Sequence, residues 1–359
     1  MTAVNDLDDR GLAERLDSEH VLDAVERFPI QCREAWALGK SASGLPDAAG
    51  LDSAVVLGMG GSGVSGDVVQ AVVEPRLPLT FRVIKSYGPL PEWIGRNTLV
   101  FAVSYSGSTE ETIEALQEAH ERGCRAVTVS SGGPLEETAR EFGIAHVAIP
   151  SGLQPRASLG YLTLPILAVL ETMGIVPDLA TDFDEAVKVL ESLADRCDRG
   201  RPLPDNPAKD LARRIVGRVP VIYGGFGVGA TAAYRFKCDL NEYGKTPAFW
   251  NVLPELDHNE IIGWDRLSEL TSESFVLILL RNAAEHPRVS LRFEITRRLI
   301  ESRFNEVVEV GAEGSSALSQ LLSLVLVTQL AAIYVGLAYG VDPGPVEVIQ
   351  KLKSELSRR

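Results

Sequence analysis

Short apolar runs rich in β-branched residues alternate with helix-like stretches along most of this chain, and this alternation limits the fold more than any other feature. In the first half the strand-like runs cover 54–60, 81–87, 98–104, 125–130 and 144–150. Helical patterns such as 108–123 separate most of them, and two helices at about 7–17 and 19–39 precede them. Strands that alternate with helices form a parallel sheet with helices packed on both faces. The sequence therefore predicts an α/β fold.

The second half of the chain repeats this alternation, with strand-like runs at 218–225, 246–253, 274–280 and 304–311. The run VVLGMG at 55–60 aligns with VIYGGF at 221–226, and in both copies an apolar strand leads through glycine into a helix. A chain of 359 residues is also long enough to form two cores. We therefore predict two tandem αβα domains, an N-terminal one over 1–198 and a C-terminal one over 208–359, joined by the proline-rich linker 199–207.

Charge and cysteine content narrow the function classes. The formal net charge is −14, and general nucleic-acid binding relies on a basic surface, so that class is excluded. A phosphorylated small molecule is compatible with this charge, because its site needs only local positive potential. The start of the chain is acidic and polar, unlike a signal peptide. Four cysteines stand far apart without a CxxC pair, which favours reduced thiols in a cytoplasmic protein: Cys32, Cys124, Cys197 and Cys238.

One uncharged segment, between Glu313 and Asp342, is long enough to span a bilayer. It contains serines, glutamines and a threonine, and no basic cluster flanks it. These features favour a fully buried helix over a membrane span.

The glycine-rich loop GMGGSGVSGD at 58–67 follows a predicted strand and opens a predicted helix. Its glycines satisfy the GxGxxG pattern of dinucleotide sites, which requires an acidic residue about twenty positions later. The corresponding stretch, VIKSY at 83–87, has no carboxylate. The glycines instead suit a tight turn whose amides, together with the Ser62 hydroxyl, face an anion. A glycine turn that binds nothing is the alternative.

The serine-rich loop SYSGST at 104–109 also lies between a predicted strand and a predicted helix. Ser108 and Glu111 fit a capping box, but capping requires only one of the hydroxyls present. Hydroxyls and free amides at a helix N-terminus can bind a phosphate dianion without a lysine. Because both loops follow neighbouring strands of a parallel sheet, we predict a phosphate site at the carboxyl ends of these strands.

SYSGST and the helix behind it resemble the phosphosugar-binding loop of the SIS (sugar isomerase) superfamily. Together with GMGGSG, three further motifs resemble one branch of it, the bifunctional phosphoglucose/phosphomannose isomerases: NEYGK at 241–245, HNEIIGW at 258–264 and VDPGPVEVIQKLKSEL at 341–356. The motifs follow the order of that family over nearly the whole chain. The resemblance implies two SIS-type domains and an isomerase that interconverts glucose 6-phosphate and/or mannose 6-phosphate with fructose 6-phosphate. It also implies an enediol intermediate, no metal or other cofactor, and a homodimer with shared active sites.

Moving a proton between C1 and C2 of the sugar calls for a carboxylate or an imidazole. The resemblance assigns this role to Glu242, as base and then acid; from the residues alone, an ion pair with Lys245 is the simpler interpretation. It assigns ring opening to His258, reaching the site from the neighbouring subunit, where imidazole can donate and accept a proton. From the residues alone, His258 is a solvated histidine. A metal site formed by Asp257, His258 and Glu260 is weaker, because adjacent residues rarely converge on one ion.

Two cations complete the predicted catalytic set. Arg156 matches the family's Pro-Arg motif and would stabilise the charge of an enediolate. Lys353 matches the lysine of the C-terminal helix near the ring end of the substrate, with Lys351 as the alternative. The resemblance also implies phosphate contacts at Gly60, Gly61, Ser62, Ser104, Ser106 and Thr109.

The chain departs from the family pattern at a few positions. Asp257 stands where asparagine is more frequent before the histidine, and a carboxylate facing the ring would favour its protonated form. Tyr243 replaces an asparagine after the glutamate, and the segment 281–300 is longer and more charged than expected. Two other functions are weighed against the isomerase. One is a non-catalytic phosphosugar-binding regulator, and the other is a nicotinamide-dependent enzyme that rests on GxGxxG, with Arg82 and Lys85 for an NADP variant.

Overall fold

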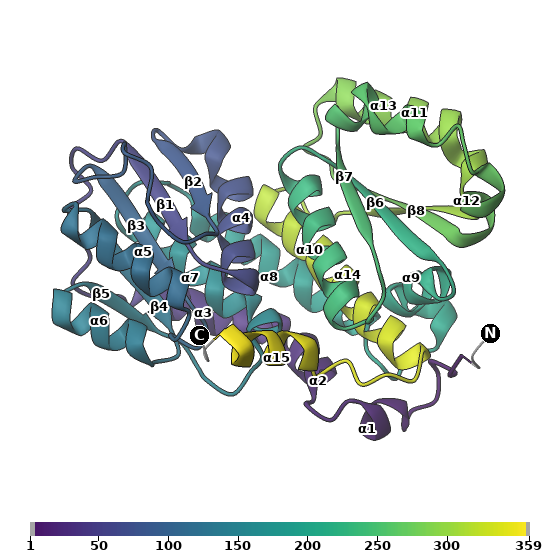
Figure 1. The fold of residues 1–359 in the computed structure, drawn as a ribbon, viewed down its shortest axis with the longest axis horizontal. Coiled ribbons are helices and arrows are strands. Elements are labelled where there is room, and N and C mark those ends of the chain that lie inside the picture. Colours follow the sequence, from purple (N-terminus) through teal and green to yellow (C-terminus); the bar gives the residue numbers. More distant parts are fainter. Residues whose placement is uncertain (1–3, 357–359) are drawn as a thin grey trace. The chain divides into compact units, whose positions relative to one another are not determined.

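The computed structural model describes residues 4–356, which form two compact units. The N-terminal unit comprises Arg27–Glu191 and Ala312–Ser323. The C-terminal unit comprises residues 4–26, 192–311 and 324–356. Figure 1 shows a sheet flanked by helices in each unit.

The N-terminal unit contains a five-stranded parallel sheet with the strand order β2-β1-β3-β4-β5. In this register Leu57 of β1 pairs with Ile84 of β2 and Ala102 of β3. The two central strands are buried on both faces, as the continuous apolar runs in the sequence predict. The strands are β1 (Ser53–Leu57), β2 (Thr80–Ile84), β3 (Thr98–Val103), β4 (Arg125–Ser130) and β5 (Ala145–Ala148).

Helices cover both faces of this sheet. On one face Leu57 and Val100 pack with Leu116 of α5. On the other face Gly66 of α4 lies against Val56. The helices are α3 (Phe28–Lys40), α4 (Gly60–Val73), α5 (Glu110–Glu121), α6 (Pro134–Phe142) and α7 (Leu159–Thr172), with the 3-10 turns η1 (Glu74–Arg76) and η2 (Pro155–Ala157).

The C-terminal unit contains a four-stranded parallel sheet with the order β7-β6-β8-β9. Its strands are β6 (Val219–Gly225), β7 (Phe249–Leu253), β8 (Phe275–Arg281) and β9 (Glu306–Gly311). Phe293 and Ile300 of α13 pack with Tyr223 and Leu279 of the sheet, so this helix covers one face. The larger helices are α9 (Pro207–Ile215), α10 (Val228–Glu242), α12 (Ser268–Ser274), α13 (Pro287–Ile300) and α15 (Glu347–Leu356). The short elements are α1 (Leu12–Leu16), α2 (Val21–Glu26), α11 (Glu260–Gly263), η3 (Leu203–Asp205), η4 (Glu255–His258) and η5 (Glu301–Arg303).

The units differ from the predicted domains 1–198 and 208–359. The first residues belong to the C-terminal unit, because Asp8 accepts hydrogen bonds from the Leu203 amide at 2.9 Å and the Lys209 amino group at 3.0 Å. The predicted linker 199–207 lies in the same unit. Its Arg199 carbonyl accepts from the Lys209 amino group at 3.0 Å, and its side chain pairs with Asp23 and Glu26.

A second difference concerns residues 312–323, which join the N-terminal unit. Glu185 of α8 (Leu179–Arg196) accepts hydrogen bonds from the Ser315 amide at 2.7 Å and the Ser316 amide at 2.9 Å. These contacts tie a segment from late in the chain to a helix of the first half. Such pairings between distant residues are not encoded in local sequence patterns.

The long uncharged segment forms α14 (Ala317–Ala338), which passes a length and hydropathy test for a membrane span yet is fully buried within the protein. Its polar residues bond inside the fold: Thr328 donates to the Leu324 carbonyl at 2.7 Å, and the Gln329 amide donates to the Tyr243 hydroxyl at 3.2 Å. The helix is therefore a core element, in agreement with the prediction of a fully buried helix.

Candidate active site

The glycine-rich loop closes against a neighbouring 3-10 turn of the N-terminal unit. A Cβ atom added to Gly61 would lie 3.0 Å from the Pro155 carbonyl oxygen, so the main chains of the two segments nearly touch. Pro155 begins η2, the turn that also carries Arg156. Only glycine allows this approach without displacing the turn. The first helical turn of α4 and the Arg156 segment are thus neighbours.

The glycine-rich and serine-rich loops are joined by a direct hydrogen bond. The Tyr105 amide donates to the buried Ser62 hydroxyl at 3.3 Å. The Tyr105 hydroxyl in turn accepts from the Leu153 amide at 2.8 Å, just before η2. Tyr105 therefore connects all three segments, which we call the three-loop cluster: residues 59–62, 104–109 and 153–156.

Thr109, rather than Ser108, is the N-cap residue of α5, and no side chain caps this helix. The Thr109 hydroxyl instead lies 2.7 Å from the buried Ser104 hydroxyl, and the Ser108 hydroxyl lies 2.9 Å from that of Ser106. The predicted capping box between Ser108 and Glu111 is therefore wrong. Since the first amides of a helix have no partner within it, those of α5 can receive an anion.

The turn between these hydroxyls requires glycine. Gly107 has a φ of +68°, and a Cβ atom at this position would lie 1.8 Å from the Gly132 carbonyl oxygen. The loop after β4 therefore passes directly over the loop after β3. This crossing fixes the serine-rich loop at the carboxyl end of the sheet, where ligands bind in open α/β folds.

Arg156 is buried at the edge of the three-loop cluster. Its turn is held from two sides, because the Gln31 amide of α3 donates to the Ala157 carbonyl at 3.0 Å and the Ser158 hydroxyl donates to the Gln154 carbonyl at 2.8 Å. The guanidinium of a buried arginine provides a fixed positive potential, here next to the glycine-rich loop.

The region around Lys85 lacks the acidic residue that a dinucleotide site requires. The Lys85 amino group forms an ion pair with Asp67 of α4. No carboxylate ends β2, which finishes at Ile84. Lys85 therefore serves to join β2 to α4, and the element that would hold a ribose is missing from this strand.

Glu242 is the last residue of α10 in the C-terminal unit and is half-buried. The end of this helix is fixed by Lys245, whose amino group donates to the main-chain carbonyls of Glu242 at 2.5 Å and Pro345 at 2.7 Å. Lys245 thus closes the helix and attaches the segment before α15. The lysine of NEYGK has a structural role at the main chain.

A buried ion pair lies on the same face of α10 as Glu242. Arg235 and Asp239 are 2.8 Å apart with side chains only 2% exposed. Burial disfavours the charge of Arg235, but Asp239, Tyr243 and Glu242 together raise the pKa of its guanidinium. Arg235 therefore stays charged, and Asp239 balances this charge within the helix that ends at Glu242. This pair belongs to none of the sequence motifs, and its i, i+4 spacing on a helix is the signal that predicts it.

His258 is exposed at the end of η4, between two acidic residues that are both engaged elsewhere. Asp257 accepts hydrogen bonds from Arg292 at 2.7 Å and Thr296 at 2.8 Å. Glu260 accepts from the Tyr223 hydroxyl at 2.6 Å. Within residues 4–356, no group of three or more His, Cys, Asp or Glu side chains could hold a metal ion. Asp257 and Glu260, the two carboxylates of the alternative metal site, thus bind Arg292, Thr296 and Tyr223 instead.

The two candidate lysines lie on α15. Lys351 is exposed, while the side chain of Lys353 lies outside the described part of the structure. The predicted residues thus fall into two groups. Those for phosphate, and Arg156, belong to the three-loop cluster of the N-terminal unit, whereas Glu242, His258 and both lysines belong to the C-terminal unit.

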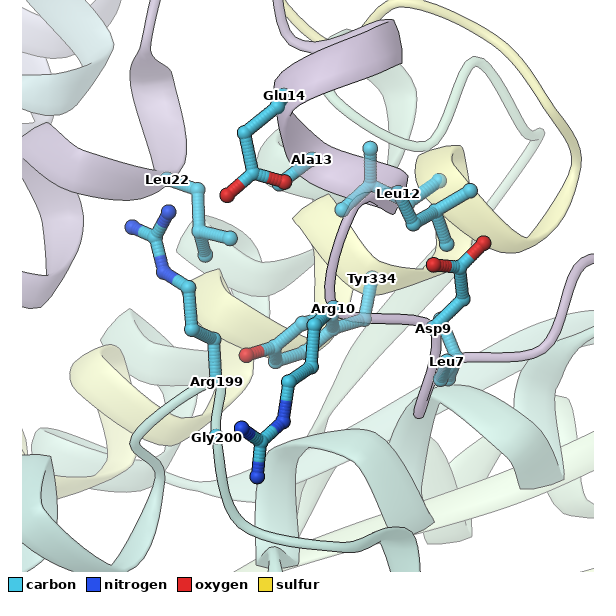
Figure 2. A pocket seen from close by; sticks show the side chains of 11 residues that line it. Leu7, Asp9, Arg10, Leu12, Ala13, Glu14, Leu22, Arg199, Gly200 and Tyr334 are labelled. Atoms are coloured by element: carbon cyan, nitrogen blue, oxygen red, sulfur yellow. The ribbon is translucent and has the colours of Figure 1, made fainter.

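A cavity of about 280 Å³ in the C-terminal unit is lined by none of the predicted residues. Figure 2 shows Leu12, Leu22 and Tyr334 among its lining side chains. Arg199, which also lines it, pairs with Glu26 and Asp23. This cavity therefore lies where the N-terminal segment packs on its unit, away from the candidate catalytic groups.

Comparison with known proteins decides the family. A model described as SIS domain matches residues 51–169, and one described as bacterial phospho-glucose isomerase C-terminal SIS domain matches residues 204–356. A bifunctional phosphoglucose/phosphomannose isomerase of Caldicellulosiruptor bescii is 34% identical over 337 residues, which cover 94% of this chain and 99% of that protein. This chain belongs to the bifunctional phosphoglucose/phosphomannose isomerase family.

Other members and neighbours of the family agree. The bifunctional phosphoglucose/phosphomannose isomerase of Aquifex aeolicus is 37% identical over 307 residues, covering 85% of this chain and 90% of that protein. A crystal structure of a glucose-6-phosphate isomerase like protein from Thermus thermophilus has a TM-score of 0.61 at 20% identity, covering 98% of this chain and 99% of that one. The predicted family and the predicted two-domain α/β fold are therefore confirmed.

Family motifs located the loops but missed the residues that hold them. Tyr105 was noted only as part of the serine-rich motif, yet its amide and hydroxyl connect the three-loop cluster. Arg292 and Thr296 lie in the charged segment 281–300, and they bind Asp257. A pair of polar residues four apart on a helix, facing an acidic residue of the HNEI motif, has no local sequence signature.

Proposed function

We propose that this protein is a metal-independent aldose–ketose isomerase that interconverts glucose 6-phosphate and mannose 6-phosphate with fructose 6-phosphate. Membership of the bifunctional phosphoglucose/phosphomannose isomerase family supports the reaction class. The observation that carries the proposal in the structure is the three-loop cluster, in which the Ser62–Tyr105 bond brings two helix-opening loops together.

In this proposal the three-loop cluster binds the phosphate of the substrate. The donors are the uncapped first amides of α5 and the hydroxyls of Ser62, Ser104, Ser106 and Thr109, with the amides of Gly60 and Gly61. Such donors favour a dianion through the helix dipole and through hydrogen bonds, without an exposed lysine. An acidic protein can thus hold a phosphate ester by local potential alone.

Glu242 then removes the proton from C2 of the open-chain aldose and returns it to C1, so that an enediol forms between the two steps. A half-buried carboxylate at a helix end is suited to this exchange, because it is accessible to substrate but partly shielded from water. Arg156 stabilises the negative charge that develops on the enediolate oxygen. Rotation about C2–C3 lets the same carboxylate serve both epimers at C2. Family membership assigns contact with the ring end of the substrate to a lysine of α15, either Lys353 or Lys351.

His258 opens the sugar ring by moving a proton between the ring oxygen and the anomeric hydroxyl. An exposed histidine can do so in an active site completed by a second copy of the chain.

Helix α13 supports a homodimer: Leu291, Ile295 and Leu299 are 40%, 36% and 60% exposed on its outer face, although its inner face already packs on the sheet. A helix with two apolar faces is typical of one that covers a subunit interface. None of the four cysteines is in a disulfide within the described residues, which supports a cytoplasmic location.

The proposal is tested by a coupled assay that starts from fructose 6-phosphate in the presence of EDTA and measures both aldose products. We expect both glucose 6-phosphate and mannose 6-phosphate from the intact protein. Glu242→Gln should lower kcat by about 10² to 10⁴-fold, because the amide cannot accept the proton. Absence of both products from the intact protein would reject the isomerase and leave phosphosugar binding as the function. Undiminished turnover by Glu242→Gln would instead reject Glu242 as the group that moves the proton.

A further inference from the structure

The turn that carries His258 is fastened to the scaffold on one side through Asp257. Both carboxylate oxygens of Asp257 are used: one accepts from the Arg292 guanidinium at 2.7 Å, and the other from the Thr296 hydroxyl at 2.8 Å. The Asp257 side chain is only 10% exposed. Bidentate use of a shielded carboxylate fixes its orientation more firmly than a single surface ion pair would.

The other side of the turn is fastened through Glu260. One Glu260 oxygen accepts from the Tyr223 hydroxyl at 2.6 Å, and the other accepts from the Asn251 amide. The Tyr223 hydroxyl accepts in turn from the Trp264 indole at 2.9 Å. Tyr223 is fully buried on β6, and burial, together with Glu260, raises the pKa of its hydroxyl, so it remains a proton donor.

Arg292 and Thr296 stand on a helix that is itself immobilised. They lie four residues apart on α13, so they share one face of the helix. Phe293 and Ile300 of the same helix are buried in the core of the sheet. The packing of α13 therefore sets the position of Asp257, and through the main chain it also sets the position of the adjacent His258. The negative charge of Asp257 is balanced by the Arg292 guanidinium.

We propose that Arg292 and Thr296 are positioning residues for ring opening: through Asp257 they hold the His258 imidazole where it meets the anomeric end of the sugar. This inference rests on the proposed function. It gives the charged segment 281–300 a role, since its helix supplies both partners of Asp257. It predicts that the loss of either partner slows the step that needs His258 and leaves the proton transfer by Glu242 intact.

Two substrates separate these steps. Fructose 6-phosphate is mostly a closed ring, whereas 5-deoxyfructose 6-phosphate lacks the hydroxyl that closes the furanose and stays open. The variants are Arg292→Leu and the nearly isosteric Thr296→Val. The matched control is Arg297→Leu, because Arg297 lies on the same helix, points away from its apolar outer face and pairs only weakly with the exposed Glu301.

We expect Arg292→Leu to lower kcat for fructose 6-phosphate by about tenfold to a hundredfold, since a displacement of about 1 Å has effects of this size. Its turnover of the open-chain analogue should stay within about twofold of the wild type, and so should both activities of Arg297→Leu. Thr296→Val should show the same selective loss with a smaller amplitude, because one of two bonds remains. Arg292→Lys, which keeps a cation, should recover part of the rate.

Two results would overturn the inference. Equal losses on both substrates would mean that α13 supports the whole fold rather than His258, and no loss on either would mean that Asp257 does not position the imidazole. Thr296→Val decides the question if Arg292→Leu does not fold. Failure of the proposed function looks different, because the wild-type protein would then turn over neither substrate.

Discussion

Two hydroxyls of the three-loop cluster hold each other in place. Ser104 and Thr109 bond each other at 2.7 Å across the turn, with Ser104 fully buried. A buried hydroxyl pair of this kind holds its oxygens in fixed directions. We therefore expect the affinity for the phosphate to fall when either the Ser104 or the Thr109 hydroxyl is removed.

Thr109→Val keeps the shape of the side chain and removes the hydroxyl. We expect KM for fructose 6-phosphate to rise about tenfold with little change in kcat, because one hydrogen bond to a charged group contributes about 1.5 kcal/mol. Thr138→Val is the matched control, since the Thr138 hydroxyl donates to the Pro134 carbonyl within α6, outside the cluster. An unchanged KM in steady-state kinetics would remove Thr109 from the phosphate contacts.

At the scale of elements, local patterns located the strands well and some helix boundaries poorly. The helix expected at about 19–39 is two helices, α2 and α3, because Pro29 in the first turn of α3 has no amide for a bond to the preceding turn. The helix after SYSGST begins one residue later than the capping box implied, because Thr109 turns towards Ser104. The residue at which a helix begins or ends thus depends partly on contacts with other segments.

The tether between α8 and residues 312–323 gives a pH-dependent prediction. Burial raises the pKa of Glu185, but hydrogen bonds from Ser315 and Ser316 outweigh this and lower it from 4.5 to about 2. A carboxyl whose folded pKa lies below its unfolded value stabilises the fold above the unfolded pKa and loses this effect as the pH falls through the folded one. The contribution is therefore complete above about pH 4.5 and fades as the pH approaches 2.

Glu185→Gln should accordingly lower the thermal unfolding temperature near neutral pH, and its deficit should shrink when melting is repeated at about pH 3. Asp184→Asn is the control, because Asp184 is exposed and makes no side-chain hydrogen bond to another described residue. An equal deficit at both pH values would show that the charge of Glu185 does not strengthen the tether.

At the scale of the whole molecule, the outer face of α13 exposes apolar side chains that one copy of the chain does not cover. Ile295→Asp places a charge at the centre of its apolar stripe, and we expect a shift from dimer to monomer by light scattering, with loss of isomerase activity. Ile30→Asp is the control: Ile30 is 46% exposed on α3 of the N-terminal unit. A dimer that survives Ile295→Asp would place the interface elsewhere.

The family, the parallel α/β architecture and the two helix-opening loops can be predicted from the sequence alone. Strand periodicity, glycine turns and clustered hydroxyls each involve only a few consecutive residues, so a short stretch of sequence is enough to predict them. Tertiary structure decided what stabilises those parts. It joined the loops through Tyr105, engaged Asp257 with Arg292 and Thr296, and grouped residues up to Glu26 with the C-terminal unit. Each of these contacts links residues far apart in the chain, and only the packing of helices and sheets brings them together.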